Sequence, residues 1–191
     1  MIRRNIKILC LQESKWIGEK ARSIGEWGHK LWYTSRDRNR NGVGVILDRQ
    51  LIDKVVDVRR KCDRILLIKL ILSDQAINVI SAYTPQISLD DASKRQFWDD
   101  LDVVMQGIPT KEKIFIGGDF NGHIRNSRTR FENAHRGYGF GDGNYAGNSI
   151  LDFVVSSNMI LANIWFMKLD FHLIIYRSGG NASQIDFFLT R

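Results

Sequence analysis

The sequence has little proline, little cysteine and no long apolar run, and each shortage excludes a class of protein. Two prolines against 16 glycines exclude collagen-like and proline-rich repeats. The two cysteines, Cys10 and Cys62, lie far apart, which argues against a disulfide framework or a zinc cluster and favours an intracellular setting, nuclear or cytoplasmic. The first apolar run stops at Gln12, too short for a signal peptide or a membrane span, so no membrane partner is expected.

The apolar content is sufficient for one globular domain. Hydrophobic residues make up 43% and aromatic residues 10% of the 191 residues, which allows a sizeable core and argues against disorder. Short apolar runs alternate with polar turns, a pattern typical of an α/β protein. Because we find neither an internal repeat nor a linker, the sequence predicts a single domain over residues 1–191.

Charge points to an acidic partner. Lys and Arg number 28 against 21 Asp and Glu, a formal net charge of +7, which favours a nucleic acid or an anionic membrane. Arginine-rich clusters can neutralise phosphates with little sequence readout, although a solubilising surface would have the same composition. Three such clusters are Arg36, Arg38 and Arg40; Arg59, Arg60, Lys61 and Arg64; and Arg125, Arg128, Arg130 and Arg136.

Apolar runs of four to eight residues between polar turns predict strands. The predicted strands are 6–11, 32–34, 42–47, 65–72, 77–83, 113–118, 159–164, 173–176 and 185–189. The polar turn at residues 73–75 predicts a hairpin between two of them. A helix capped by Ser88 and stopped near Gly107, and a second helix over 149–156, complete the pattern, while 125–147 reads as a long loop.

Polar motifs stand at the ends of several predicted strands. In chain order they are Leu11-Gln12-Glu13-Ser14-Lys15, Ser81-Ala82-Tyr83-Thr84-Pro85, Gly117-Gly118-Asp119-Phe120-Asn121-Gly122-His123 and Ser183-Gln184-Ile185-Asp186-Phe187. Each one alone is a weak signal, because Asp and Asn are common in turns. Their types and order together resemble the motif series of the endonuclease/exonuclease/phosphatase superfamily. The resemblance extends to the nuclease domains of non-LTR (LINE-type) retrotransposons and to craniofacial development protein 2-like proteins.

The resemblance implies a role for each motif residue. Glu13 would hold a Mg²⁺ ion, with Mn²⁺ as an alternative cofactor. Asp119 would orient or deprotonate the attacking water, and Asn121 and Tyr83 would contact the phosphate. Asp186 would orient a catalytic imidazole. The alternatives are a solvated Glu13, an Asx turn at Asp119 and a core tyrosine at 83.

His123 follows the Asp119 motif closely, and we expect it to shape the loop or to contact DNA. The resemblance also implies a four-layer α/β sandwich like that of DNase I, in which two mixed sheets are flanked by helices. Compared with that pattern, the chain is expected to lack the first strand, with its Asn near the metal, and the last strand, with the catalytic His.

Three hypotheses follow for function. The first is a Mg²⁺-dependent DNA endonuclease domain of retroelement origin, with DNA bound through Arg36, Arg38, Arg40, Arg125, Arg128 and Arg130. The second is a remnant that binds nucleic acid without catalysis, and the third is a phosphatase of the same fold. No feature of the sequence indicates a protein partner.

Overall fold

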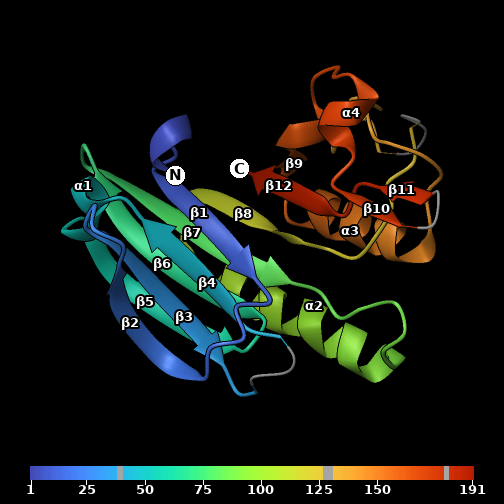
Figure 1. The fold of residues 1–191 in the computed structure, drawn as a ribbon. Coiled ribbons are helices and arrows are strands. Elements are labelled where there is room, and N and C mark those ends of the chain that lie inside the picture. Colours follow the sequence, from blue (N-terminus) through green and yellow to red (C-terminus); the bar gives the residue numbers. More distant parts are fainter. Residues whose placement is uncertain (38–40, 127–130, 179–180) are drawn as a thin grey trace. The chain divides into compact units, whose positions relative to one another are not determined.

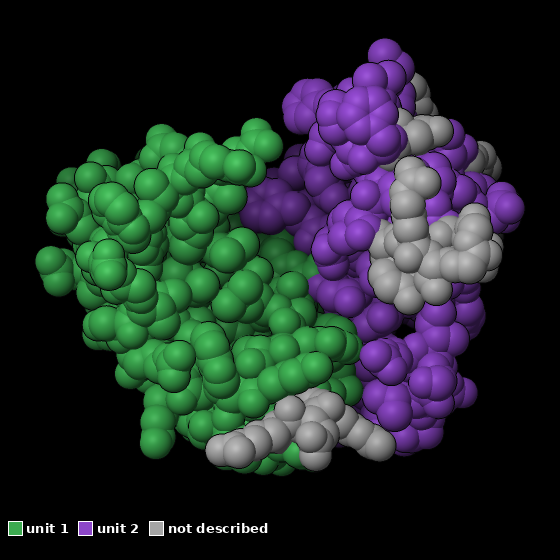
Figure 2. All heavy atoms as spheres, viewed as in Figure 1, with its two compact units in different colours: residues 1–83, 99–118 green, residues 84–98, 119–191 purple. Residues whose placement is uncertain are grey.

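The computed structural model describes the whole chain except residues 38–40, 127–130 and 179–180 (Figure 1). The described residues form two compact units, coloured separately in Figure 2. Unit 1 contains Met1–Tyr83 and Asp99–Gly118, and unit 2 contains Thr84–Trp98 and Asp119–Arg191. The single domain expected from the sequence stays a prediction.

The first sheet of unit 1 has four antiparallel strands. Their spatial order is β1 (Ile8–Gln12), β4 (Val43–Leu47), β3 (His29–Ser35) and β2 (Gly18–Ile24). Strand β2 was not predicted, because five of its seven residues are exposed and no apolar alternation marks it. Its charged side chains suit the open edge of a sheet, where they discourage pairing with another chain.

In the second sheet, four strands of unit 1 follow one another in the order β5 (Val55–Cys62), β6 (Ile65–Leu72), β7 (Gln75–Tyr83) and β8 (Lys113–Asp119). The predicted hairpin is confirmed, since β6 and β7 are antiparallel with Leu72 opposite Gln75. Ser73 and Asp74 make the two-residue turn, both with positive φ, 45° and 64°, as the twist of a tight hairpin requires. Strand β5 was not predicted, because it mixes three basic residues with its valines.

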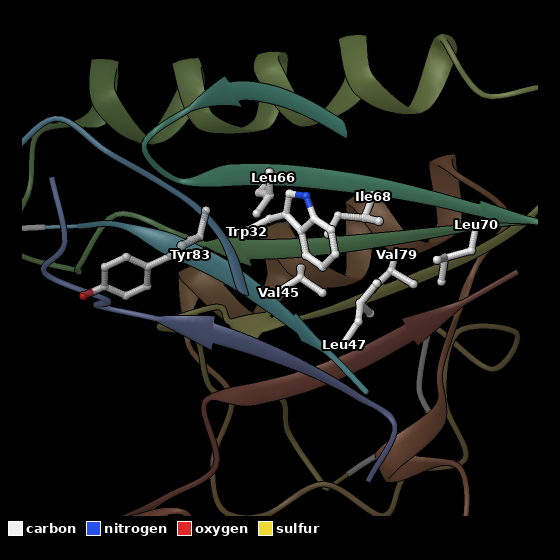
Figure 3. Packing of buried hydrophobic residues seen from close by; sticks show 9 residues of the cluster. Trp32, Val45, Leu47, Leu66, Ile68, Leu70, Val79 and Tyr83 are labelled. Carbon is white, nitrogen blue, oxygen red and sulfur yellow. The ribbon is translucent and has the colours of Figure 1, made fainter. Parts of the chain in front are cut away.

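The two sheets of unit 1 face each other across an apolar core. Trp32, Val43, Val45 and Leu47 from the first sheet pack against Leu66, Ile68, Leu70, Val79 and Tyr83 from the second. All nine are buried, and Figure 3 shows eight of them with labels. Tyr83 lies at the end of this row, with its hydroxyl oxygen pointing away from the other side chains.

Unit 1 contains one short helix and the second half of a long one. The short α1 (Arg49–Ile52) is capped by Asp48, whose side chain accepts the N–H of Gln50. The long α2 (Asp91–Gln106) begins in unit 2 and ends in unit 1. The predicted cap at Ser88 is wrong: the N–H of Ser93 donates to Asp90 at 2.8 Å. Residues 86–89 instead form a turn closed by the N–H of Leu89 and the carbonyl of Gln86.

Unit 2 is built around α3 (Tyr145–Ser156), which buries Ile150, Leu151, Phe153 and Val154. The short β9 (Ile160–Leu161) pairs with β12 (Asp186–Thr190), and β10 (Tyr176–Ser178) pairs with β11 (Asn181–Ser183). The helix predicted over 149–156 starts earlier because Asn144 caps it. The strand predicted over 173–176 is wrong at its start, since Leu173 closes the helical turn α4 (Asp170–Leu173).

Two short 3-10 helices, Ile2–Arg4 and Ala162–Ile164, complete the secondary structure of the described residues. The predicted loop has neither helix nor strand before α3 at its described positions. Among the described residues, no helix combines the length and the apolarity that crossing a membrane would require.

The core of unit 1 predicts different costs for two isoleucines of the same strand. Ile68 is fully buried between the sheets, whereas Ile71 is 37% exposed. We expect Ile68→Ala to lower the free energy of unfolding by about 2–5 kcal/mol, because it leaves a cavity. Ile71→Ala, the matched control, should cost less than about 1.5 kcal/mol. Urea unfolding followed by circular dichroism measures both, and equal losses would contradict the sandwich.

Candidate active site

In unit 1, a carboxylate is held at the end of β1. Glu13 follows the strand with a positive φ of 51°, a strained conformation for a residue other than glycine. The Tyr83 hydroxyl, at the end of β7, donates to Glu13 Oε1 at 2.6 Å. Glu13 is exposed while Tyr83 is only 3% exposed. A buried phenol therefore fixes an accessible carboxylate.

The ends of β1 and β7 are joined by further hydrogen bonds. The Ser81 hydroxyl donates to the carbonyl of Leu11 at 3.0 Å, and Gln12 Nε2 donates to Ser81 Oγ at 3.2 Å. These bonds run between strands of different sheets, so they anchor the turn that carries Glu13. Strain at a residue is maintained only where surrounding contacts hold it.

Arg64 supports Tyr83 from a second side. Its guanidinium lies 5.1 Å from the centre of the Tyr83 ring, and its Nη1 donates to the Tyr83 carbonyl at 3.2 Å. Burial lowers the pKa of Arg64 below its ordinary value, yet an arginine remains charged at any physiological pH. The Tyr83 ring is thus held between the apolar core and the Arg64 guanidinium, which restricts the direction in which the Tyr83 hydroxyl points.

The thiol of Cys10 also links β1 and β7. Cys10 of β1 donates from Sγ to the carbonyl of Ile80 on β7, with a separation of 3.7 Å. Burial raises the pKa of this thiol to about 12. The thiolate, which is the nucleophilic and metal-binding form, is therefore suppressed at Cys10.

The Glu13 carboxylate is compatible with a hard divalent cation. Tyr83 engages Oε1, so Oε2 of this exposed side chain is available to a ligand. Mg²⁺ commonly binds through one or two carboxylates and keeps several waters. Among the described residues, no group of three or more His, Cys, Asp or Glu side chains forms a preassembled metal cage. The chemistry of Glu13 fits a hydrated Mg²⁺ rather than a fully protein-coordinated ion.

In unit 2, Asp119, the last residue of β8, and Asn121 form a compact turn. Asp119 Oδ1 accepts the N–H of Asn121 at 2.9 Å, and Asn121 has a positive φ of 46°. Asn121 Nδ2 donates to the carbonyl of Thr84 at 3.0 Å, while the N–H of Thr84 donates to the carbonyl of Asp119. The Asx turn considered from the sequence is present, and it fixes both side chains.

The loop that contains Asp119 and Asn121 packs against the N-terminal end of α3. Asn144 Oδ1 accepts the N–H of His123 at 3.0 Å and that of Gly147 at 2.8 Å. A Cβ on Gly147 would lie 1.8 Å from the carbonyl oxygen of His123, so only glycine allows this approach. The backbone of His123 shapes the loop, in agreement with its expected role.

Asp186 is the first residue of β12. Burial raises the pKa of its carboxyl above the ordinary value, and the described residues supply no hydrogen bond or ion pair to that side chain. Its carbonyl accepts from Asn163 Nδ2 at 3.0 Å, and Asn163 Oδ1 accepts the N–H of Phe188. Asn163 therefore fixes the backbone around Asp186, while the carboxyl remains available for a cationic partner.

The arginine clusters differ in how far they are engaged within the protein. Arg36 and Arg125 are exposed, as a phosphate contact requires. Arg38, Arg40, Arg128 and Arg130 lie outside the described residues. The second cluster makes internal contacts, since Arg59 pairs with Asp57, Lys61 pairs with Asp100, and Arg60 and Arg64 donate to backbone carbonyls.

Sequence comparison assigns the chain to a family. The sequence profile of the Endonuclease/Exonuclease/phosphatase family matches residues 3–171, a range that includes four of the five motif residues. The chain belongs to the endonuclease/exonuclease/phosphatase family. Family members generally use divalent metals, in keeping with the chemistry of Glu13.

Two curated proteins are similar to this chain over the whole of its length. They are craniofacial development protein 2 of Tragulus javanicus and of Bos taurus, each 25% identical over 194 residues. The match covers 100% of the chain but only 33% and 32% of these relatives. The chain thus spans about a third of the length of the curated relatives it matches.

Two solved endonucleases share the fold. The endonuclease domain of TRAS1, a telomere-specific non-LTR retrotransposon, superposes with a TM-score of 0.63 at 13% identity, covering 98% of this chain and 74% of that one. The AP endonuclease LMAP from Leishmania major gives 0.63 at 12% identity, covering 100% and 71%. These likenesses confirm the predicted α/β fold of the DNase I type, with two sheets and helices.

Some supporting residues were not identified from sequence. Arg64 was assigned to a basic cluster, although its role is to hold Tyr83. Asn163 was not singled out, because an isolated Asn between apolar residues carries no pattern. The position of Asn144 just before an apolar helical run was the available signal for a cap.

Asn144 predicts a measurable contribution to unit 2. We expect Asn144→Ala to lower the free energy of unfolding by about 1–2 kcal/mol, because two backbone N–H groups lose their acceptor. Asn148→Ala, at an exposed position of the same helix, should be neutral or slightly stabilising. Thermal unfolding compares them, and an equal effect of both changes would contradict the capping role.

The raised pKa of Asp186 predicts that replacing this carboxyl with a neutral side chain increases the stability of the protein, by an amount that depends on pH. Burial disfavours the charged form, so the wild type loses stability as pH rises from the ordinary value of 3.8 through the raised folded pKa. Asp186→Asn should therefore be more stable than wild type at neutral pH and lose this advantage below pH 3.8. Urea titrations at several pH values measure the difference. Asp142→Asn, at an exposed position, is the control. An increase in the stability of Asp186→Asn that does not change with pH would argue against a partly buried carboxylate.

Proposed function

We propose that the chain acts in Mg²⁺-dependent hydrolysis of DNA phosphodiester bonds, as an endonuclease. The observation that carries this proposal is the Glu13 carboxylate, held at the end of β1 in a strained conformation by the Tyr83 hydroxyl at 2.6 Å. Strained, over-determined residues concentrate at functional sites. Family membership supplies the reaction class, since its members cleave phosphate esters.

Glu13 would hold the metal through its free oxygen, and Tyr83 would keep the carboxylate oriented and contact the phosphate. A bound Mg²⁺ supplies charge stabilisation for the phosphoryl oxygens and the leaving group. Because the Tyr83 ring is packed between the core and Arg64, its hydroxyl has little freedom to move. Preorganised donors of this kind need no rearrangement during the reaction.

Asp119 and Asn121 would act on the attacking water and on the phosphate. Asp119 takes the role of general base, and Asn121 donates to a phosphate oxygen with the N–H of Nδ2 that Thr84 does not use. Asp186 would orient a catalytic imidazole. Its half-buried carboxyl, with a raised pKa and no positive partner among the described residues, is suited to stabilise an imidazolium.

DNA is the proposed substrate on grounds of charge. The net charge of +7 and the exposed Arg36 and Arg125 favour a polyanion. We propose Arg38, Arg40, Arg128 and Arg130 as further phosphate contacts. The ordered motifs, which resemble those of non-LTR retrotransposon nucleases, support the proposal of a retroelement origin.

The test is nicking of supercoiled plasmid by the purified chain in Mg²⁺ and in EDTA. Mg²⁺-dependent nicking should fall by about 10²–10⁴-fold in Asp119→Asn and in Glu13→Gln, because each removes a group on which the proposed chemistry depends. Glu19→Gln and Asp142→Asn, both at exposed positions without a proposed role, should retain activity.

Other outcomes separate the remaining hypotheses. If the plasmid stays intact while the folded protein retards DNA in a gel-shift assay, the result would support nucleic-acid binding without catalysis. Hydrolysis of soluble phosphate esters in preference to DNA would indicate a phosphatase. Nicking that persists in both site variants would refute the assigned residues.

A further inference from the structure

A pocket in unit 2 adjoins the proposed catalytic turn. Residues from the loop after β7, the first half of α2 and the first turn of α3 line a cavity of about 380 Å³. This volume lies in the range of small-ligand sites. Phe120, between Asp119 and Asn121, forms part of the wall. Thr84 is a second wall residue, and its carbonyl accepts from Asn121 Nδ2.

Part of the pocket lining is apolar. Pro85, Ile87, Trp98 and Phe120 contribute to the lining. The Trp98 and Phe120 rings are stacked, with centroids 6.3 Å apart and an interplanar angle of 20°. Trp98 also contacts Phe153 at 5.3 Å, so its ring is fixed in position. A fixed aromatic ring beside a phosphate-handling turn offers a surface on which a nucleobase can stack.

Two basic residues of α2 also contribute to the pocket lining. Lys94 and Arg95 both line it, together with Asp91. Lys94 Nζ lies 3.3 Å from Asp91 Oδ1, so the charge of this lysine is balanced within the helix. Arg95 is exposed. It is therefore the cation of α2 that we assign to an anionic ligand in the pocket.

The first turn of α3 also lines the pocket, and it contains no acidic residue. Asn144 caps the N–H of Gly147, so its side chain does not occupy the earlier N–H groups of Tyr145 and Ala146. Helix N-termini with available N–H groups attract phosphate. This turn and Arg95 thus favour the same kind of ligand.

A buried hydroxyl without a partner is an independent indication of a ligand. Thr84 is 4% exposed, and the described residues supply no partner for its Oγ1. Both backbone polar groups of Thr84 are already bonded within the catalytic turn. Buried polar atoms in native proteins are seldom left unsatisfied. The hydroxyl of this lining residue is thus the one polar group of Thr84 that remains for a bound molecule.

We propose that this pocket binds one nucleotide of the DNA strand, next to the bond that is cleaved. The base lies against Trp98 and Ile87, and its phosphate lies near Arg95 and the first turn of α3. Stacking with no base-specific contacts makes the site tolerant of sequence. The proposal rests on the proposed function, because it is the catalytic turn that places a phosphate beside the pocket.

The experiment titrates the full chain, in EDTA, with the 5′-phosphorylated trinucleotide of thymidine. NMR follows the Trp98 indole N–H and the amides of Tyr145 and Ala146. We expect saturable shifts at these groups, an affinity about tenfold weaker in Arg95→Ala because a charge-assisted contact is lost, and no saturation in Ser149→Trp, which fills the cavity. Lys111→Ala, at an exposed position outside the pocket, is the control and should bind like wild type.

Plasmid nicking by the same preparations separates the two proposals. A chain that nicks plasmid but shows no shifts at the pocket overturns the pocket and leaves the function intact. Saturable shifts in a chain that never nicks support the pocket and refute the endonuclease. Equal binding by inorganic phosphate would overturn the nucleotide assignment in favour of a simple anion site. Circular dichroism establishes that Ser149→Trp is folded, and Arg95→Ala provides the test if it is not.

Discussion

The apolar packing between the two sheets of unit 1 sustains the local geometry described there. Trp32, Val45 and Leu47 on one side and Leu66 and Ile68 on the other are removed from water only while the sheets stay together. Glu13 directly follows β1 and Tyr83 ends β7, and these strands belong to different sheets, so the hydrogen bond between the two side chains exists as a consequence of that packing. The strained backbone of Glu13 is maintained in the same way, by hydrophobic free energy gained elsewhere in the unit.

Strands with continuous apolar runs could be predicted from the sequence, because burial on both faces leaves an unambiguous pattern. Strand β6 matches its predicted bounds, and the Ser73-Asp74 turn fixed its hairpin. Strands β2 and β5 could not be predicted, since charged side chains interrupt their apolar residues and the backbone pairing with a neighbour decides their conformation. Propensity also misplaced the start of α2: two acceptors, Ser88 and Asp90, lie close together, and only the hydrogen bond to Ser93 distinguishes them.

For the candidate site, the sequence proposes groups that carry a motif and gives no sign of the residues that hold them. Glu13, Asp119 and Asp186 are candidates because their motifs, taken together and in order, resemble those of the endonuclease/exonuclease/phosphatase superfamily. The position of Arg64 against the Tyr83 ring depends on the side-by-side register of β6 and β7, which no local pattern contains. The pocket beside Phe120 combines residues about fifty positions apart, so it forms only once α2 and α3 are in place.

The thiol of Cys10 gives this architecture a built-in chemical reporter. With a pKa of about 12 and its sulfur directed at the Ile80 carbonyl, it carries almost no thiolate while β1 and β7 remain joined. Separation of the sheets would return the thiol to its ordinary acidity and expose it to alkylating reagents. The rate at which a maleimide consumes Cys10 therefore measures how often the Glu13 end of the sandwich opens, without any mutation near the acidic side chain itself.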